Sequence, residues 1–580
     1  MWKYIKKYLI FAVIAAAFMV GEVLMDLLQP EIMSSIVDDG VLGLNHGGIG
    51  NMDLIWSLGI RMIGLVLFGG LCGSLNNVFV HMTGQNIGNE MRKDAFRKIM
   101  TFSFPQVDRF GTGSLVTRVT NDITQVQNFV SQFVRGMIRT SMLMFGSIFF
   151  MFRLNRTFGL IVLCAFPFIV GCLAFCLSKA NPLFSKLQAQ LDKINSIMQE
   201  DVSGIRIIKA CVRECYEKMR FGKANDSLIQ TQLQVLTIFA FMNPIINALM
   251  YVVVATILAT GSYEVGAGSA TPGNIMAAIT YTTQLLNGIL MLTMLFQNIS
   301  RGLASWKRVK EVLHCQPDLS DGRFDGKTKI HGQVEFRNAT FAYPGSNQVI
   351  LKNINLTIYP GETVAIMGVT GCGKSSLVNL IPRFYDVTEG AILVDGVDVR
   401  EYNQKALREK ISVALQKSEL FSATIAQNIE WGTPGLGSEA IRHAATIAQA
   451  DSFVSATSDG YDTMVAERGM SLSGGQKQRL SIARAIVKDA EILIFDDSTS
   501  ALDLKTEADL YDALATAAPN RTKIIIAQRI ASVRRADRIV VLAGGCVEAC
   551  GSHEELMKTS TTYRDIYDSQ LGEGDRHGGQ

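Results

Sequence analysis

The stretch Gly368-Val369-Thr370-Gly371-Cys372-Gly373-Lys374-Ser375 determines how the rest of the chain is interpreted. It matches the phosphate-binding pattern Gly-x4-Gly-Lys-Ser/Thr at every fixed position. A strand-like apolar run at 364–367 precedes it and a helix-like run at 375–380 follows it, as the pattern requires. Glycines let successive backbone N–H groups and a helix N-terminus face a phosphate. The stretch therefore predicts a nucleoside triphosphate site, in which Lys374 reaches the outer phosphates and Ser375 ligates Mg²⁺.

The composition indicates a membrane protein of several domains. The chain has 580 residues, of which 48% are hydrophobic and only 18% are charged, and its mean hydropathy is +0.22. The low charged fraction and the positive mean hydropathy favour membrane segments. The net charge of +3 gives no reason to expect a nucleic-acid partner. The ten cysteines are scattered and no histidine cluster joins them, so neither a metal site nor a disulfide framework is expected.

Six stretches in the first half are apolar enough to cross a bilayer, which takes about 20 residues. They cover residues 8–29, 54–80, 134–153, 157–178, 238–260 and 274–297. The long connections 81–133 and 179–237 contain many Lys and Arg residues, whereas the loops 30–53 and 261–273 contain none. The positive-inside rule therefore predicts that both termini and both long connections are cytoplasmic.

Each long connection is expected to extend the membrane helices into the cytoplasm and to turn back where helix breakers occur. Pro105 and the glycines at 111–113 interrupt the first connection, and Gly204 interrupts the second. Such turns are natural contact points for a cytoplasmic motor. We expect these contacts near Phe110–Leu115 and Ala210–Tyr216.

Two features of the spans bear on a transported substrate. Glu22 and Asp26 lie four residues apart, on one face of the first span. Intramembrane carboxylates contact either a cation or substrate, or a neighbouring helix, and both interpretations stay open. Spans five and six carry adaptable and polar side chains that suit either a permissive pocket or ordinary packing. These are Met242, Asn243, Asn247, Met250, Gln284, Asn287, Met291 and Met294.

The second half has the pattern of a soluble α/β domain. We expect a membrane domain over 1–301, a linker over 302–331, a nucleotide-binding domain over 332–571 and a disordered tail over 572–580. Tyr343, on a turn before the phosphate loop, is placed to stack on a nucleobase. After Glu491, the apolar run 492–495 leads into Asp496 and Asp497, the layout of a strand whose carboxylates hold Mg²⁺ and position water.

Leu472-Ser473-Gly474-Gly475-Gln476 opens another helix with exposed backbone N–H groups. It is a second anion-binding helix terminus in a domain that already has one. A single nucleotide cannot contact both termini within one fold. The motif therefore favours a dimer that closes around ATP.

These motifs, in this order, closely resemble those of the ATP-binding cassette (ABC) exporters, in the half-transporter arrangement of six membrane helices followed by an α/β P-loop nucleotide-binding domain. The resemblance covers about residues 1–570. It implies that Tyr343 stacks on adenine and that Ser375, Gln416 and Asp496 hold Mg²⁺. It further implies that the nucleotide contacts Gly368, Gly371, Gly373, Lys374, Ser375, Ser376 and Gln416 of one chain, and Ser473, Gly474, Gly475, Gln476 and Asp503 of the other.

Two positions depart from the family pattern. The residue after Asp496 is usually a catalytic glutamate, and here it is Asp497. A switch histidine usually stands where this chain has Gln528. Asp is one methylene shorter than Glu, and Gln is neutral and cannot play the charge-sensing part of His. Because the 472–476 motif is intact, the resemblance implies the degenerate-site subunit of a heterodimer, with Asp497, Gln528 and Gln416 as its catalytic positions.

The sequence therefore predicts ATP-driven, multidrug-type export of a small amphipathic or hydrophobic substrate across a plasma membrane. The predicted partner is a second half-transporter with Glu and His at the positions that correspond to Asp497 and Gln528. A lipid flippase, a peptide exporter, a homodimeric exporter and an ATP-gated channel or regulatory membrane protein stay open as alternatives. A soluble cassette acting on nucleic acid is excluded by the six spans.

Overall fold

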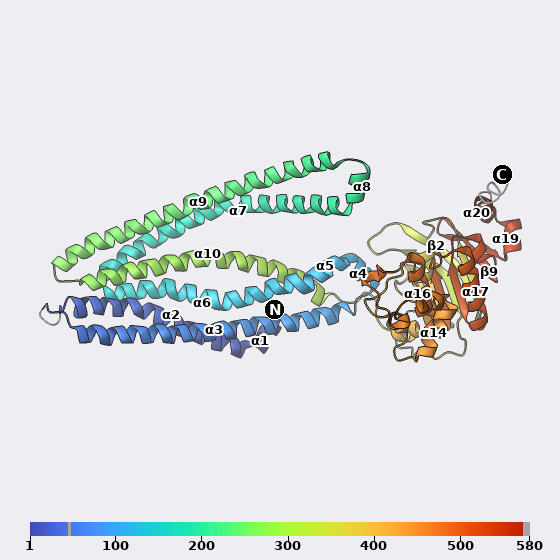
Figure 1. The fold of residues 1–580 in the computed structure, drawn as a ribbon, viewed down its shortest axis with the longest axis horizontal. Coiled ribbons are helices and arrows are strands. Elements are labelled where there is room, and N and C mark those ends of the chain that lie inside the picture. The colour runs from blue at the N-terminus through green and yellow to red at the C-terminus, as the bar shows by residue number, and fades with distance from the viewer. Residues whose placement is uncertain (45–47, 572–580) are drawn as a thin grey trace. The chain divides into compact units, whose positions relative to one another are not determined.

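The computed structural model describes residues 1–44 and 48–571, so the tail predicted at 572–580 lies outside the described residues. The chain divides into two compact units. The first comprises Met1–Met100 and Gly113–Cys315, and the second comprises Thr101–Thr112 and the chain from Gln316 onward. Figure 1 shows long helices in the first unit and mixed helices and strands in the second.

The first unit is built of helices. Among its described residues, six helices are long and apolar enough to cross a membrane, which confirms the six predicted spans. The α-helices are α1 (Trp2–Lys7), α2 (Leu9–Ser35), α3 (Met52–Ile99), α5 (Thr112–Thr117), α6 (Ile123–Leu154), α7 (Arg156–Ser203), α8 (Ile205–Ala210), α9 (Glu214–Gly266) and α10 (Pro272–His314). Two π-helical turns, η1 (Ile36–Val41) and η2 (Arg118–Asp122), continue α2 and lead into α6.

Side-chain caps set where three of these long helices begin. Asn51 accepts a hydrogen bond from Leu54 N (3.2 Å) before α3, and Asn155 accepts one from Thr157 N (2.7 Å) before α7. Thr271 caps α10, which has proline at its first position. Because such caps satisfy backbone N–H groups that have no partner inside the helix, they allow the chain to reverse within a short turn.

The second unit contains two sheets (Figure 1). The larger has the strand order β10-β9-β3-β8-β7-β6, and the smaller has the order β2-β1-β4-β5. Parallel pairing joins β9, β3, β8, β7 and β6, so their carboxyl ends meet at one edge. The strands are β1 (Val334–Ala342), β2 (Val349–Ile358), β3 (Thr363–Met367), β4 (Glu389–Val394), β5 (Val397–Asp398), β6 (Ile411–Ala414), β7 (Ile492–Asp496), β8 (Thr522–Ile526), β9 (Arg538–Ala543) and β10 (Cys546–Gly551).

Helices cover the larger sheet and extend beyond it. They are α4 (Phe104–Phe110), α11 (Lys374–Leu380), α12 (Gln404–Lys410), α13 (Ile425–Glu430), α14 (Ser438–Ile447), α15 (Asp451–Ser455), α16 (Gly474–Val487), α17 (Leu504–Ala517), α18 (Ile530–Val533), α19 (His553–Thr559) and α20 (Thr561–Leu571). Short 3₁₀ turns, η3 (Gly460–Asp462) and η4 (Glu467–Gly469), precede α16. This unit and the six spans together confirm the predicted fold class.

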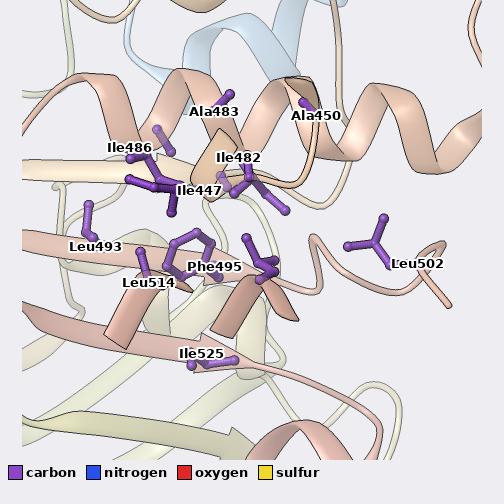
Figure 2. Close-up of a cluster of buried hydrophobic side chains, with 14 of the residues drawn as sticks. Ile447, Ala450, Ile482, Ala483, Ile486, Leu493, Phe495, Leu502, Leu514 and Ile525 are labelled. Atoms are coloured by element: carbon purple, nitrogen blue, oxygen red, sulfur yellow. The ribbon is translucent and has the colours of Figure 1, made fainter. Parts of the chain in front are cut away.

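A buried apolar cluster fixes the strand that carries the paired carboxylates. Figure 2 shows Leu493 and Phe495 of β7 lying between Ile482 and Ile486 of α16 on one side and Ile525 of β8 on the other. All five side chains are less than a tenth exposed. Close packing of this kind leaves few alternative positions for β7. The next residues, Asp496 and Asp497, are therefore held at a defined place on the sheet edge.

The helix α4 lies in the first predicted connection and belongs to the second unit. Ser103 and Gln106 form a capping box, and Pro105 lies in the first turn of α4. The Phe104 ring stacks on Phe384 with centroids 4.4 Å apart, and Tyr385 donates a hydrogen bond to Asp108 (2.7 Å). Both contacts lie N-terminal to the predicted stretch Phe110–Leu115, because the Ser103 box and Pro105 begin a helix here.

The second predicted contact stretch, Ala210–Tyr216, lies in the first unit. It comprises the end of α8, a short connection and the start of α9. Val212 has a left-handed backbone (φ 51) and a side chain that is 79% exposed. Its contact with a cassette stays a prediction.

Candidate nucleotide-binding site

A cavity of about 350 Å³ lies at the carboxyl edge of the larger sheet. Nine of the sequence-predicted site residues line it: Tyr343, Gly371, Gly373, Lys374, Ser375, Ser376, Gln416, Asp497 and Gln528. Its other lining residues are Ile350, Thr370 and Ile526. Ile350 belongs to β2 and Ile526 ends β8, so no local motif pointed to either of them.

Two glycines of the phosphate loop are required by its geometry. Gly368 has φ +150, and a Cβ there would lie 2.2 Å from the carbonyl oxygen of Leu542. Gly373 has φ +100, and a Cβ there would lie 2.8 Å from Leu351. The loop thus passes so close to β2 and β9 that side chains at these positions would clash.

Lys374 and Ser375 begin α11 at the floor of the cavity. The Lys374 Nζ donates to the carbonyl oxygens of Gly368 (2.7 Å) and Val369 (3.1 Å). The Ser375 hydroxyl donates to Asp496 Oδ1 at 2.8 Å. Burial raises the pKa of Asp496, the Ser375 bond opposes the rise, the neighbouring Asp497 adds to it and Lys374 opposes it. A hydroxyl and a carboxylate oxygen this close are hard ligands of the type that Mg²⁺ takes together with phosphates.

Tyr343 forms one wall of the cavity. Its hydroxyl is 2.8 Å from Ser376 Oγ. Its ring lies edge-on to Phe341 and to Tyr385, at centroid distances of 4.9 and 5.3 Å. These contacts fix an aromatic ring beside the phosphate loop, where a base can stack on it.

Asp497 and Gln528, the two positions that differ from the family pattern, are hydrogen-bonded to each other. Gln528 Nε2 donates to Asp497 Oδ2 at 2.9 Å, and Gln416 Nε2 donates to the same oxygen at 3.2 Å. Asp497 is 7% exposed and has a left-handed backbone with φ 47. Because β7 and β8 are adjacent parallel strands, their following residues meet at the sheet edge. The Asp497 Oδ2 atom thus accepts hydrogen bonds from two side-chain amides.

The 472–476 motif lies outside this cavity. Ser473 caps α16 and forms a capping box with Gln476, in which Ser473 N donates to Gln476 Oε1 at 2.9 Å. Gly474 and Gly475 form the first turn of α16, close to Ala501. Asp503 likewise caps α17, accepting from Thr506 N at 2.9 Å. Within one chain, these residues therefore form a separate helix terminus.

The intramembrane carboxylates of α2 are paired with an arginine that the sequence argument did not consider. Arg139 of α6 forms ion pairs with Glu22 and, at 3.3 Å, with Asp26. Gln284 of α10 donates to the carbonyl oxygen of Asp26 at 3.1 Å. These contacts correspond to the interpretation in which a neighbouring helix satisfies the carboxylates. The signal available in the sequence was that Arg139, like Arg135, lies within the third span and away from its outer end at Arg153.

Other predicted pocket residues of spans five and six are spread over their helices. Met242 is 6% exposed and packs in the core of the first unit, whereas Asn247 and Asn287 are exposed. Met250 and Met291 are half-buried. The side chains of Asn243 and Met294 lie outside the described part of the structure. The pocket assignment therefore stays a prediction.

The fold and the cavity define a membrane protein with a nucleotide-driven motor, and comparison with known proteins gives its family. Residues 10–289 match the ABC transporter transmembrane region and residues 351–500 match the ABC transporter domain. An uncharacterized ABC transporter ATP-binding protein, YfiB of Bacillus subtilis, is 37% identical over 573 residues, which is 98% of each chain. An ATP-dependent lipid A-core flippase of Syntrophus aciditrophicus is 34% identical, over 90% of this chain and 87% of that protein.

The solved structure of a bacterial Atm1-family ABC exporter with ATP bound matches with a TM-score of 0.80 and 25% identity, covering 98% of both chains. The chain belongs to the ABC transporter family and has the exporter architecture. It is a multi-pass membrane protein with an ATP-binding cassette, of a family whose exporters work as dimers in a lipid bilayer.

Proposed function

We propose that this chain is one subunit of a heterodimeric ABC exporter and that its own nucleotide site binds ATP but hydrolyses it slowly. The transported substrate is a small amphipathic or hydrophobic molecule. The protein spans the plasma membrane, with both termini and the nucleotide-binding domain in the cytoplasm. The distribution of Lys and Arg among the connections supports this orientation.

The observation that carries the proposal is the hydrogen-bonded pair Asp497 and Gln528. The Asp497 carboxylate replaces a longer glutamate, and amides of Gln528 and Gln416 donate to one of its oxygens. These bonds occupy one Asp497 oxygen, and the shorter side chain reaches less far toward an attacking water than a glutamate would. Gln528 is neutral at every pH, so it offers no imidazolium charge to an outer phosphate. Both departures therefore weaken the same step, the activation of water.

The binding machinery supports ATP and Mg²⁺ at the same site. The glycine geometry of 368–373, the ammonium of Lys374 and the Tyr343 ring are those of a nucleotide pocket. Ser375 and Asp496, with Gln416 nearby, supply the oxygen ligands for Mg²⁺. When bound, the ion would neutralise phosphate charge.

The partner implied by this asymmetry carries Glu and His at the positions of Asp497 and Gln528. Its nucleotide would meet the helix terminus at Ser473, Gly474 and Gly475 of this chain. That terminus keeps its capping box and its glycines. The partner's site would therefore carry most of the turnover.

The test compares ATPase rates of the chain with and without its partner. The full-length chain is purified by an affinity tag from its native membrane, so that any second half-transporter comes with it, and separately from a host without one. Asp497→Asn should change the ATPase rate of the pair by less than about twofold. Ser473→Arg should lower it by about 10²–10³-fold, the scale for losing an electrostatic contact to the reacting phosphate. Ser458→Arg, which adds the same charge at an exposed serine, is the control.

Two results would overturn the proposal. The first is that the chain alone hydrolyses ATP at the rate of the pair, which would favour a homodimer. The second is that Asp497→Asn and Ser473→Arg are equally damaging. Both results would place full catalytic activity in this chain's own site.

A lipid substrate is the second candidate. Its support is the 34% identity, over 90% of this chain, to an ATP-dependent lipid A-core flippase. Reconstituted vesicles that contain fluorescent phospholipids would separate the two candidates. ATP-dependent movement of the lipid between leaflets, together with no efflux of amphipathic dyes, would favour the flippase.

A further inference from the structure

The C-terminal helix α20 contributes one side chain to the loop that carries Gln528. Gln570 Nε2 donates to the carbonyl oxygen of Gln528 at 2.7 Å, and Gln570 Oε1 accepts from Ile530 N at 2.8 Å. One carboxamide thus bonds the backbone on both sides of a single residue, Arg529. A carboxamide can bond in this way because it has an NH₂ donor for a backbone carbonyl and an oxygen acceptor for a backbone N–H.

The helix that carries Gln570 is anchored at its other end. Tyr563 is fully buried, and its hydroxyl is 2.7 Å from His553 Nδ1 of α19. Ile566 and Tyr567 pack against the main hydrophobic cluster of the unit. The position of Gln570 is therefore set by the packing of α20 and not by its two hydrogen bonds alone.

The same loop is held on its opposite side by Arg529. Its guanidinium donates to the carbonyl oxygens of Leu502 (2.9 Å) and Ser500 (3.3 Å) and pairs with the buried Glu507 at 3.3 Å. The segment 528–530 thus lies between two anchors. Loss of one anchor leaves the other in place, so the loop can shift without unfolding.

We propose that Gln570 is a positioning residue for the nucleotide site: by fixing the backbone around Arg529, it sets where the Gln528 carboxamide lies relative to Asp497 and the outer phosphate of a bound nucleotide. This inference rests on the proposed function because it needs ATP in this cavity. It does not depend on whether the partner is a second copy or a different chain. The measurable consequence is discrimination between ATP and ADP, which differ only in that outer phosphate.

The experiment measures the equilibrium affinities of ATP and ADP for the full-length chain in phospholipid nanodiscs with Mg²⁺. Gln570→Ala and Gln570→Met should each lower the ratio of ATP affinity to ADP affinity by roughly twofold to tenfold, the scale of one or two hydrogen bonds. Met keeps the length of the side chain and loses both bonds. Asp568→Ala, at an exposed position of the same helix, should leave the ratio unchanged. An effect of Ala without an effect of Met would overturn the inference, because packing would then explain it.

A double-mutant cycle with Gln528→Ala excludes a merely structural role. If Gln570 acts by positioning the Gln528 side chain, Gln570→Met should have no further effect on the ratio once that side chain is gone. Additive effects would overturn the inference. Failure of the wild-type chain to bind ATP would overturn the proposed function as well. An unchanged ratio in Gln570→Met, with normal ATP binding, would overturn this inference alone.

Discussion

The two ends of the nucleotide cavity differ in how they are built. At the phosphate-loop end, Gly368 and Gly373 have conformations that other residues would strain, and Ser375 bonds Asp496. At the switch end, a short carboxylate and a neutral amide, Asp497 and Gln528, bond each other. The first end has the groups expected to bind phosphate, and the second has neither the glutamate nor the histidine of the family pattern. Under the proposed function, binding and hydrolysis are therefore separable in this cavity.

The largest effect should come from restoring the switch end. Asp497→Glu combined with Gln528→His should raise hydrolysis at this chain's own site by about 10²–10⁴-fold, the usual contribution of a well-placed general base. The measurement is the ATPase rate of the pair in which Ser473→Arg in this chain has silenced the other site. Each single change serves as a control and should recover less than the two together.

A failure of the double change would locate the defect elsewhere. If hydrolysis stays low while ATP affinity is normal, the backbone at position 497, with φ 47, does not hold a glutamate in a productive position. The comparison between the two ends would then rest on backbone geometry and not on side-chain identity.

At the binding end, Lys374→Ala should lower ATP affinity by about 10- to 100-fold, because hydrogen bonds from a charged donor contribute about 1.5–3 kcal/mol. Lys374 is a cation that lines the described cavity. Lys352→Ala, at an exposed position of β2, is the matched control and should bind ATP normally. Isothermal titration with ATP and Mg²⁺ measures both. Equal affinity in the two variants would remove Lys374 from the site.

Tyr343 belongs to the binding end and should have a smaller effect. Tyr343→Ala should weaken ATP binding by about 1–2 kcal/mol, the scale of base–aromatic stacking. Tyr343→Phe keeps the ring, loses the bond to Ser376 and should bind nearly as the wild type does. If Phe is as damaging as Ala, the hydroxyl and not the ring is the functional group.

The sequence predicted the fold class because its signals are local and repeated. Apolar runs give the six spans, and the phosphate-loop pattern lies between a strand and a helix, as expected. The sequence did not predict contacts between distant segments. The ion pairs of Arg139 with Glu22 and Asp26 join α6 to α2. The hydrogen bonds of Gln570 join α20 to the segment 528–530. Pairing of this kind depends on packing angles and helix rotations, which no single segment encodes.

The site shows the same limit. Residues within one motif could be assigned from sequence, but Ile350 and Ile526 enter the cavity because of strand order. The position of α4 also depended on a detail of helix capping. From sequence Pro105 indicates an interruption, whereas with the Ser103 box it starts a helix whose Phe104 and Asp108 contact Phe384 and Tyr385. The same residue type serves both purposes, and only its neighbours distinguish them.

The smallest effect should come from Tyr385, which joins α4 to the binding end of the cavity. Its hydroxyl donates to Asp108 at 2.7 Å, and its ring lies edge-on to Tyr343. Burial raises the pKa of Tyr385 and the Asp108 carboxylate raises it further, so the hydroxyl stays protonated at every pH used in an assay. Tyr385→Phe removes the hydrogen bond and keeps the ring.

This change should therefore distinguish the role of the α4 contact from the role of the cavity in binding ATP. We expect ATP affinity to stay within about twofold of the wild-type value because the Tyr343 wall is intact. We expect stimulation of the ATPase by a transported substrate to fall by about threefold to tenfold, the scale of the net contribution of one ordinary hydrogen bond. Asp108→Asn keeps an acceptor oxygen and should cause a smaller loss. If Tyr385→Phe instead lowers ATP affinity as much as Tyr343→Ala does, then α4 contributes to the shape of the nucleotide pocket itself, and the binding end extends beyond the phosphate loop and the Tyr343 wall.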